Sequence, residues 1–146
     1  MQGKVLSLFI TKDDTTKTRL EVTKVSVDTH GILKDKFYKK DPMRAILITS
    51  KESYNLSNEN DINLEKGSLG ENILIDISPY NLVSGDKFNI GETIFEITQN
   101  CTLCKGLSAV DKRLPKLLKN DRGIFAKVIS GHSEIHLGDK VKISTY

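Results

Sequence analysis

The chain of 146 residues contains no tryptophan, and aromatic residues make up only 6% of it. A hydrophobic core built from this composition must consist mainly of isoleucine, leucine and valine side chains. Cysteine is also scarce, with two residues at positions 101 and 104. A chain of this length buries about two-thirds of its unfolded surface without disulfide or metal crosslinks. We therefore expect one domain, spanning residues 1–146, that needs no covalent staples.

Long apolar runs and a strong charge of one sign are missing as well. No stretch approaches the ~20 apolar residues that a membrane helix requires. The first residues, MQGKVLSLFITKDD, lack the apolar centre and cleavage site of a signal peptide. The 22 basic and 19 acidic residues give a formal net charge of +3 at pH 7, an excess too small to indicate nucleic-acid binding. We therefore expect a cytoplasmic protein that binds neither membranes nor nucleic acid.

Short apolar or alternating segments, separated by turn residues, make up most of the chain. They predict strands at Lys4–Thr11, Arg19–Asp28, Ala45–Thr49, Ile73–Ile77, Lys87–Ile90, Thr93–Thr98, Ile124–Ile129 and Val141–Ser144. The alternation in the second of these slips at Thr23 and Lys24, which predicts a β-bulge. Many short strands at this spacing favour a β-barrel or a rolled mixed sheet.

Two helical segments interrupt the strands. The pattern Thr49-Ser-Lys-Glu52 is typical of a capping box, and it predicts a helix that begins after Thr49 and runs to about Leu56. Apolar residues at helical spacing predict a second helical region between residues 107 and 118. Because Pro115 cannot occupy an undisturbed helix interior, this region is either two short turns or a helix that begins near Pro115.

The two cysteines stand in the segment ITQNCTLCKGL, between a predicted strand and the second helical region. Cytoplasmic thiols stay reduced, so we do not expect a structural disulfide. Two cysteines and three scattered histidines do not form a recognisable four-ligand zinc site. Lys105 and nearby cations favour the thiolate, which is the reactive form of cysteine. From these residues alone, a reactive thiol, a Cys101–Cys104 redox pair and two small buried side chains all remain open.

Three further segments carry candidate binding residues. The segment GSLGEN, residues 67–72, offers backbone N–H groups to an anion, but it lacks the lysine of a P-loop, and its simpler interpretation is a turn with glycines at positive φ. His30 stands at the end of a predicted strand. Arg122 is the cation best placed to line a pocket for an anionic ligand, although the basic residues before it also suit the solvated face of a helix.

Taken in order, these segments resemble a known family. The motifs are His30-Gly-Ile-Leu-Lys-Asp35, Arg44-Ala-Ile-Leu-Ile-Thr49, Gly67-Ser-Leu-Gly-Glu-Asn72, Gly85-Asp86 with Gly91, Ile97-Thr-Gln99, Cys104, Gly123-Ile-Phe-Ala-Lys-Val128 and Leu137-Gly-Asp139. From about residue 2 to residue 143, the chain is similar to the MOSC domain, named after the C-terminal domain of molybdenum cofactor sulfurase. The resemblance implies a mainly β fold, a barrel formed by a rolled mixed sheet, with a few short helices.

The resemblance also implies a function. MOSC domains are associated with molybdenum cofactor binding and with sulfur transfer, in which a cysteine carries a persulfide sulfur or ligates molybdenum. Cys104 matches that cysteine, so it is the implied catalytic residue and molybdenum ligand, whereas Cys101 is an extra residue, either a bystander or a resolving partner. The residues implied to bind the cofactor, including its phosphate, are His30, Arg44, Gly70, Glu71, Asn72, Lys105 and Arg122.

The family implies partners too. One implied partner is a cysteine desulfurase, which would supply the sulfur. The other is a redox partner protein, which would exchange electrons with the chain as part of a molybdenum-dependent reductase system. The pyridoxal-phosphate domain of the full sulfurase is absent from the sequence, so we do not expect that cofactor. Two other functions stay open. One is a non-catalytic module that binds a cofactor or partner and has a structural cysteine, and the other is a CxxC redox switch.

Overall fold

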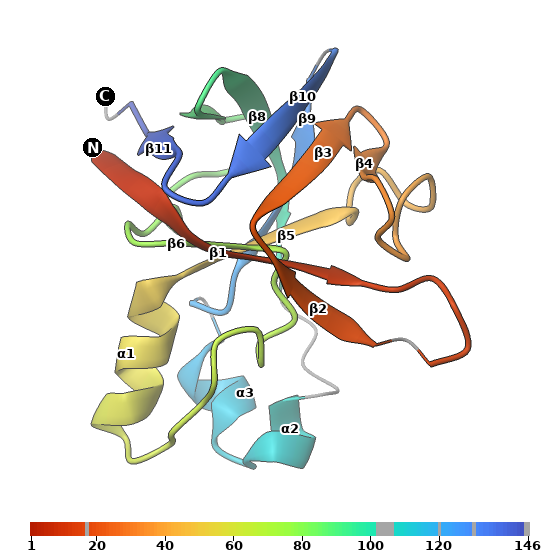
Figure 1. Cartoon of the computed structure of the whole chain (residues 1–146). Helices are drawn as coiled ribbons and strands as arrows, with labels where there is room; N and C mark the ends of the chain where they lie inside the picture. The colour runs from red at the N-terminus through yellow and green to blue at the C-terminus, as the bar shows by residue number, and fades with distance from the viewer. Residues whose placement is uncertain (17, 102–106, 120, 130, 145–146) are drawn as a thin grey trace.

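The computed structural model describes residues 1–16, 18–101, 107–119, 121–129 and 131–144. Figure 1 shows the strands wound into a barrel, with the helices gathered at one end of it. The elements, in chain order, are β1 (Gln2–Thr11), β2 (Arg19–Val22), β3 (Lys24–Asp28), β4 (Gly31–Ile32), β5 (Ile46–Ser50), α1 (Lys51–Glu59), β6 (Ile73–Ile75), β7 (Lys87–Ile90), β8 (Thr93–Asn100), α2 (Leu107–Val110), α3 (Leu114–Leu117), β9 (Ile124–Val128), β10 (His132–His136) and β11 (Lys140–Lys142).

Most strands belong to one closed sheet. Neighbouring strands pair in the order β11-β7-β8-β9-β5-β6-β1-β2, and β11 also pairs with β1. This last pairing closes the ring and leaves β2 as an extension on the side of β1. β5 and β6 are parallel, whereas the other pairs of the ring are antiparallel. The mainly β fold with a rolled mixed sheet is therefore confirmed, and closure leaves few exposed strand edges.

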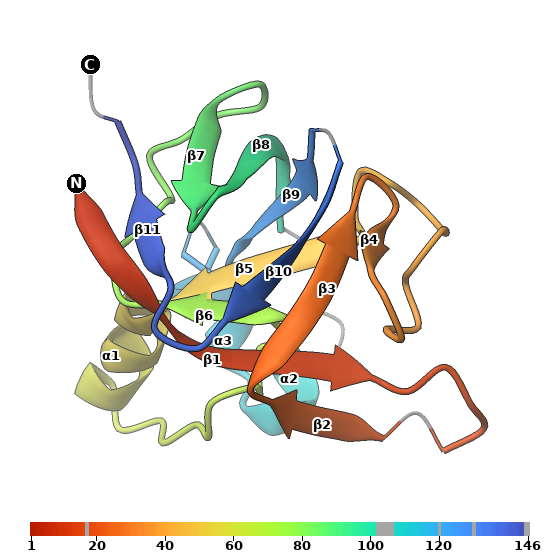
Figure 2. The same ribbon diagram turned by 45° about the horizontal axis from the view of Figure 1, so that its top comes forward.

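A smaller sheet, in the order β10-β3-β4, covers one side of the barrel (Figure 2). Thr23 separates β2 from β3, so the predicted bulge is in fact the point where the chain leaves the large sheet for the small one. β4 and β10 were not predicted from the sequence. β4 has two residues, and β10, with the sequence HSEIH, has Ile135 as its single apolar residue, so neither shows an apolar alternation.

Strand alternation divides the side chains of β5 between two environments. Ile46 and Ile48 are fully buried and belong to the main core inside the barrel, so Leu47 between them points to the opposite face. Phe125 on β9 is the register partner of Leu47, and these two side chains pack with Cys101 in a separate small cluster. This cluster forms the floor of the site described below.

The first helix begins one residue later than the capping box predicts. The hydroxyl of Ser50, not that of Thr49, accepts a hydrogen bond from the Glu52 N–H at 3.1 Å. Thr49 remains in β5, and its hydroxyl donates to the Arg122 carbonyl oxygen at 3.0 Å. Both residues are good N-caps, so the sequence pattern alone does not separate them.

The second helical region consists of two short turns, α2 and α3, as one of the two interpretations predicts. Pro115 lies in the first turn of α3, where its missing N–H has no helical partner to lose. Leu114 and Leu118 are fully buried and pack with Tyr54 of α1 and Leu74 of β6. In the part of the chain that is described, no helix is long and apolar enough to span a membrane.

Candidate functional site

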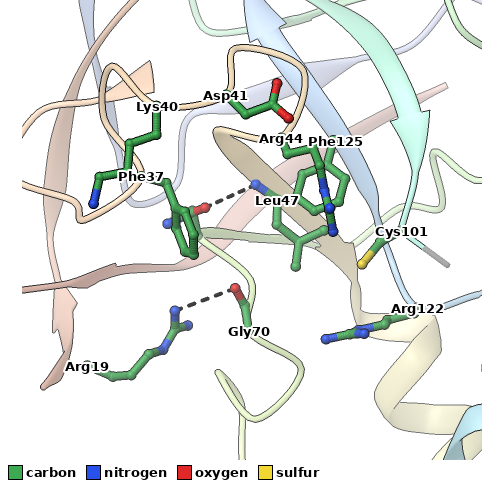
Figure 3. Close-up of a pocket in the computed structure, with 11 residues that line it drawn as sticks. Arg19, Phe37, Lys40, Asp41, Arg44, Leu47, Gly70, Cys101, Arg122 and Phe125 are labelled. Carbon is green, nitrogen blue, oxygen red and sulfur yellow. Dashed lines mark hydrogen bonds between the residues drawn. The ribbon is translucent and has the colours of Figure 1, made fainter. Parts of the chain in front are cut away.

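A cavity of about 520 Å³ lies over Leu47 and Phe125, on the outer face of the barrel (Figure 3). This volume is within the usual range for small-molecule sites. Its walls come from β2, from the loop 33–45 between β4 and β5, from the loop 67–72 before β6, and from the segments that end β8 and begin β9. The lining residues are Arg19, Phe37, Lys40, Asp41, Arg44, Leu47, Gly70, Asn72, Cys101, Arg122 and Phe125.

The cavity is strongly cationic. Arg19, Lys40, Arg44 and Arg122 line it, against the single carboxylate of Asp41. That carboxylate accepts a hydrogen bond from the N–H of residue 43 at 2.9 Å, as an aspartate in a turn commonly does. Because several positive charges converge on one concave surface, the cavity attracts anions.

Arg44 keeps its hydrogen-bond donors available to a ligand. Its guanidinium lies 5.3 Å from the centroid of the Phe125 ring, a cation–π contact. Within the described residues, its guanidinium makes no hydrogen bond or ion pair, and the side chain is exposed. A contact of this kind contributes about 0.5–1 kcal/mol at an exposed site, so it orients the side chain without occupying its N–H groups.

A bulge in β8 brings Cys101 to the cavity. The register of β8 against β9 shifts between Ile97 and Gln99, and the hydroxyl of Thr98 donates to the Met43 carbonyl oxygen at 2.5 Å. After the strand ends, the Cys101 N–H donates to the carbonyl oxygen of residue 123 at 3.0 Å. Cys101 is only 5% exposed, and Figure 3 shows its sulfur directed toward the cavity between Phe125 and Arg122.

The structure brings four of the residues implied by the family resemblance to this cavity, namely Arg44, Gly70, Asn72 and Arg122. Cys104 and Lys105 lie outside the described residues. His30 and Glu71 do not line the cavity.

His30 and Glu71 lie in different surroundings. His30 is exposed at the turn between β3 and β4, where its ring packs edge-on against Tyr38 with centroids 6.2 Å apart. Glu71 is fully buried and accepts a hydrogen bond from the Tyr54 hydroxyl at 2.6 Å. The first is thus a surface residue that does not line the cavity, and the second belongs to the interior behind it.

The backbone N–H groups of residues 67, 68, 69, 70 and 72 donate hydrogen bonds within the protein. Gly70 N donates to the Gly67 carbonyl oxygen at 3.1 Å, and Asn72 N donates to the Leu47 carbonyl oxygen at 2.8 Å. Gly67 and Gly70 have φ of +88° and +85°, the conformation that favours glycine. The turn interpretation of this segment is therefore confirmed.

The Asn72 side chain connects three parts of the chain. Its Oδ1 accepts from the Leu47 N–H at 3.0 Å, and its Nδ2 donates to the Phe9 carbonyl oxygen at 3.2 Å and to Asp35 Oδ1 at 3.4 Å. It is 4% exposed. Asn72 therefore holds β1, β5 and the loop 33–45 together at the edge of the cavity, with its amide already committed to protein partners.

Sequence reasoning missed several residues that line the cavity. Arg19, Phe37, Lys40, Asp41, Leu47 and Phe125 had no assigned role, and Cys101 was described only as a bystander or resolving partner. Their proximity arises from strand pairing, such as Leu47 with Phe125, between segments far apart in the chain. One signal was available in Phe125, which follows Gly123 and Ile124 in a matched motif and carries a large side chain on the outer face of a strand.

Comparisons with known proteins agree with this architecture. A family model described as the MOSC domain matches residues 35–142. The structure is similar to that of the YuaD protein from Bacillus subtilis, with a TM-score of 0.79, 18% identity, and coverage of 97% of this chain and 94% of that one. It is also similar to YiiM from Escherichia coli, with a TM-score of 0.72, 19% identity, and coverage of 100% of this chain and 71% of that one.

YiiM from Geobacillus stearothermophilus is similar as well, with a TM-score of 0.72, 16% identity, and coverage of 98% of this chain and 75% of that one. At these identities, the likeness to the solved structures concerns the fold. No curated protein sequence matches the chain. The family model, however, spans well over half of the sequence and includes most of the residues that line the cavity. The chain therefore belongs to the MOSC domain family.

Proposed function

We propose that this MOSC domain protein binds the molybdenum–pterin cofactor in the cationic cavity, and that a cysteine of the segment 101–104 carries sulfur or ligates the metal there. The observation that carries the proposal is the convergence of four cationic side chains and one thiol on a single cavity of about 520 Å³. The family association with molybdenum and sulfur chemistry supports the same choice of ligand.

The residues present fit such a group. Guanidinium groups bind phosphate oxygens through several N–H donors in a fixed plane, which suits the phosphate of the cofactor. Thiolate is a soft ligand that suits soft metal centres and sulfur. Leu47 and Phe125 supply an apolar floor for a flat ring system. When bound, the cofactor supplies a redox-active metal, a function that no side chain of the site provides.

The cations have different roles in this proposal. Arg44, whose donors are available, is the residue that contacts the anionic group. Arg19 donates to backbone carbonyl oxygens of the loop 67–72, so it acts mainly through its charge. The field of these cations also favours the thiolate form of a cysteine at the site.

Sulfur transfer to Cys104 requires no net oxidation. The Cys104 thiolate attacks the terminal sulfur of a donor persulfide, a new S–S bond forms, and the S–S bond of the donor breaks. The donor leaves as a thiolate, and the transferred sulfur keeps its proton. A cysteine desulfurase is the class of partner that presents such a persulfide, and a redox partner would replace it if the metal is ligated instead.

The test is the molybdenum and pterin content of the protein purified from a host that makes the cofactor. The wild type is compared with Cys104→Ser and Cys101→Ser, and circular dichroism confirms that each variant is folded. We expect close to one molybdenum and one pterin phosphate per chain in the wild type, loss of the metal in Cys104→Ser, and little change in Cys101→Ser.

Other outcomes have definite meanings. Loss of metal in Cys101→Ser alone would transfer the role of ligand to the cysteine that lines the cavity. A wild type without molybdenum or pterin would reject cofactor binding, and mass spectrometry would then show whether Cys104 carries an additional sulfur atom. A reversible Cys101–Cys104 disulfide with neither feature would favour a redox switch.

A further inference from the structure

The loop 67–71 holds two of the arginines of the cavity by its carbonyl oxygens. Arg19 Nη2 donates to the carbonyl oxygens of residues 71 and 67 at 2.5 and 3.4 Å, and its Nη1 donates to that of residue 70 at 3.5 Å. Arg122 Nη2 donates to the carbonyl oxygen of residue 69 at 3.3 Å. In Figure 3, Arg19 and Arg122 approach Gly70 from opposite sides. The carbonyl oxygens of one short loop therefore fix the positions of two guanidinium groups at the cavity.

The other side of the same loop is held by a buried pair, Tyr54 of α1 and Glu71. The Tyr54 hydroxyl donates to Glu71 Oε2 at 2.6 Å. The Gly67 N–H donates to the Tyr54 hydroxyl oxygen at 3.0 Å and to Glu71 Oε2 at 3.1 Å, and the Leu69 N–H reaches the hydroxyl oxygen at 3.4 Å. The loop is therefore held between a tyrosine–carboxylate pair inside and two arginines at the cavity.

Burial strengthens the inner contacts. Tyr54 is 8% exposed and Glu71 is fully buried, so water does not compete for these hydrogen bonds. Burial, together with the negative charge of Glu71, raises the pKa of the Tyr54 hydroxyl well above its ordinary value. The hydroxyl therefore remains a donor to Glu71 throughout the physiological pH range.

We propose that Tyr54 and Glu71 are positioning residues for anion binding, because they hold the loop 67–71 in the conformation whose carbonyl oxygens place Arg19 and Arg122 at the cavity. Neither Tyr54 nor Glu71 lines the cavity. The inference rests on the anion site of the proposed function, but it requires neither molybdenum nor a reactive cysteine. It also gives the glycine-rich loop an indirect role, since the loop orients cations and the N–H groups of residues 67 to 70 bond within the protein.

The test compares Tyr54→Phe with Tyr80→Phe. Both variants keep the aromatic ring and lose one hydroxyl that is hydrogen-bonded inside the protein. The Tyr80 hydroxyl contacts the Ser50 N–H at 2.8 Å and the Ser53 hydroxyl at 2.6 Å, at the start of α1, and it makes no hydrogen bond with the described part of the loop 67–71. Tyr80→Phe therefore controls for the loss of one buried, hydrogen-bonded hydroxyl that donates to neither the loop nor the two arginines.

Two measurements are made on each variant. Calorimetric titration with inorganic phosphate at low ionic strength gives the affinity, and the NMR signals of the arginine Nε–H groups report the surroundings of Arg19 and Arg122. We expect Tyr54→Phe to raise the Kd for phosphate about 5- to 10-fold, the effect of one disturbed hydrogen-bond network. We also expect it to shift the signals of both arginines, whereas Tyr80→Phe leaves the Kd and these signals unchanged.

The outcomes separate this inference from the proposed function. If the wild type does not bind phosphate, the anion site itself fails. If the wild type binds but the two variants lose affinity equally, or if the arginine signals stay in place in Tyr54→Phe, the positioning role is overturned. A lower melting temperature in both variants with unchanged affinity would likewise make Tyr54 purely structural.

Discussion

The two loops that flank the cavity use their residues in opposite ways. In the loop 67–72, the side chains of Leu69, Glu71 and Asn72 are buried and most of the N–H groups bond within the protein. In the loop 33–45, Phe37 and Arg44 are exposed and face the cavity. The first loop therefore forms the frame of the site, and the second presents the surface that a ligand meets.

This difference between the two loops shows that the residues of a family motif need not contact the ligand. Gly70, Glu71 and Asn72 belong, with Gly85-Asp86 and Cys104, to the most specific part of the resemblance, yet Glu71 and Asn72 are committed to partners within the protein. A buried polar group that loses its hydrogen-bond partner leaves its desolvation cost uncompensated, so such residues tolerate little change. Exposed side chains of the loop 33–45 carry no such constraint and can be replaced at lower cost to the fold.

The largest expected effect is that of Asn72→Ala. The substitution leaves the Leu47 N–H and the Phe9 carbonyl oxygen buried without their partner, so the free energy of unfolding should fall by about 2–4 kcal/mol. Urea unfolding, monitored by circular dichroism, measures this free energy. Asn55→Ala, at an exposed position of α1, is the matched control, with an expected change within about 0.5 kcal/mol. A change below about 1 kcal/mol for Asn72→Ala, together with a clear loss of phosphate affinity, would reassign Asn72 to the ligand.

An intermediate effect is expected for Arg44→Ala, in the open loop. Loss of a charge-assisted contact should raise the Kd for phosphate about tenfold, while the free energy of unfolding falls by less than about 1 kcal/mol because only a cation–π contact is lost. Calorimetric titration and urea unfolding measure the two quantities. Lys142→Ala removes one exposed positive charge from β11, outside the cavity, and should leave the Kd nearly unchanged. An equal rise of the Kd in both variants would show that phosphate affinity depends only on the net charge of the protein.

The smallest expected effect on stability comes from Arg113, a cation outside the cavity that is held in place by hydrogen bonds, as Arg19 is. Arg113 donates to Asp111 through its side chain and its backbone N–H, and these hydrogen bonds lower the pKa of Asp111 from an ordinary 3.8 to about 2. Because the pKa is lower in the folded chain, this contribution to stability is present above pH 3.8 and disappears as the pH falls toward 2.

Carboxyl-carbon NMR titration measures the pKa of Asp111 directly. We expect a value near 2 in the wild type and near 3.8 in Arg113→Ala, with Lys112→Ala behaving like the wild type. Titration of wild-type Asp111 near pH 4 would show that Arg113 is not anchored in solution. The comparison between anchored and open cations would then rest on Arg19 and Arg122.

Much of the fold could be predicted from the sequence because it is encoded locally. Lys87–Ile90 was predicted with its observed bounds, and most other predicted strands, such as the one at Ile124, differ from the structure mainly at their ends, whereas the one at Arg19–Asp28 is divided between two sheets. The errors have local causes too. Ser50 rather than Thr49 caps α1 because either hydroxyl suits that position, and β10 escaped notice because a strand with one apolar residue has no apolar period.

The site was less predictable. Arg44 and Arg122 were expected to bind the cofactor from the family resemblance, and the structure places both at the cavity. Arg19 was not assigned to binding, since nothing in its local sequence distinguishes it from a surface residue, and Cys101 was set aside because Cys104 matches the family cysteine. Pairing of β1 with β2 and of β8 with β9 carries them to the cavity, and such pairings between distant segments have no signature in a single sequence.

The sequence by itself determined the composition of the core, the strand-rich pattern, the turns at Gly67 and Gly70, and membership of the MOSC domain family, because periodicity, glycine conformation and ordered motifs are properties of neighbouring residues. Only the tertiary structure decided that the loop 67–71 turns its carbonyl oxygens to Arg19 and Arg122 and its N–H groups to Tyr54. The packing of α1 behind the loop sets that orientation, because the Gly67 and Leu69 N–H groups find their partner in the Tyr54 hydroxyl on that side.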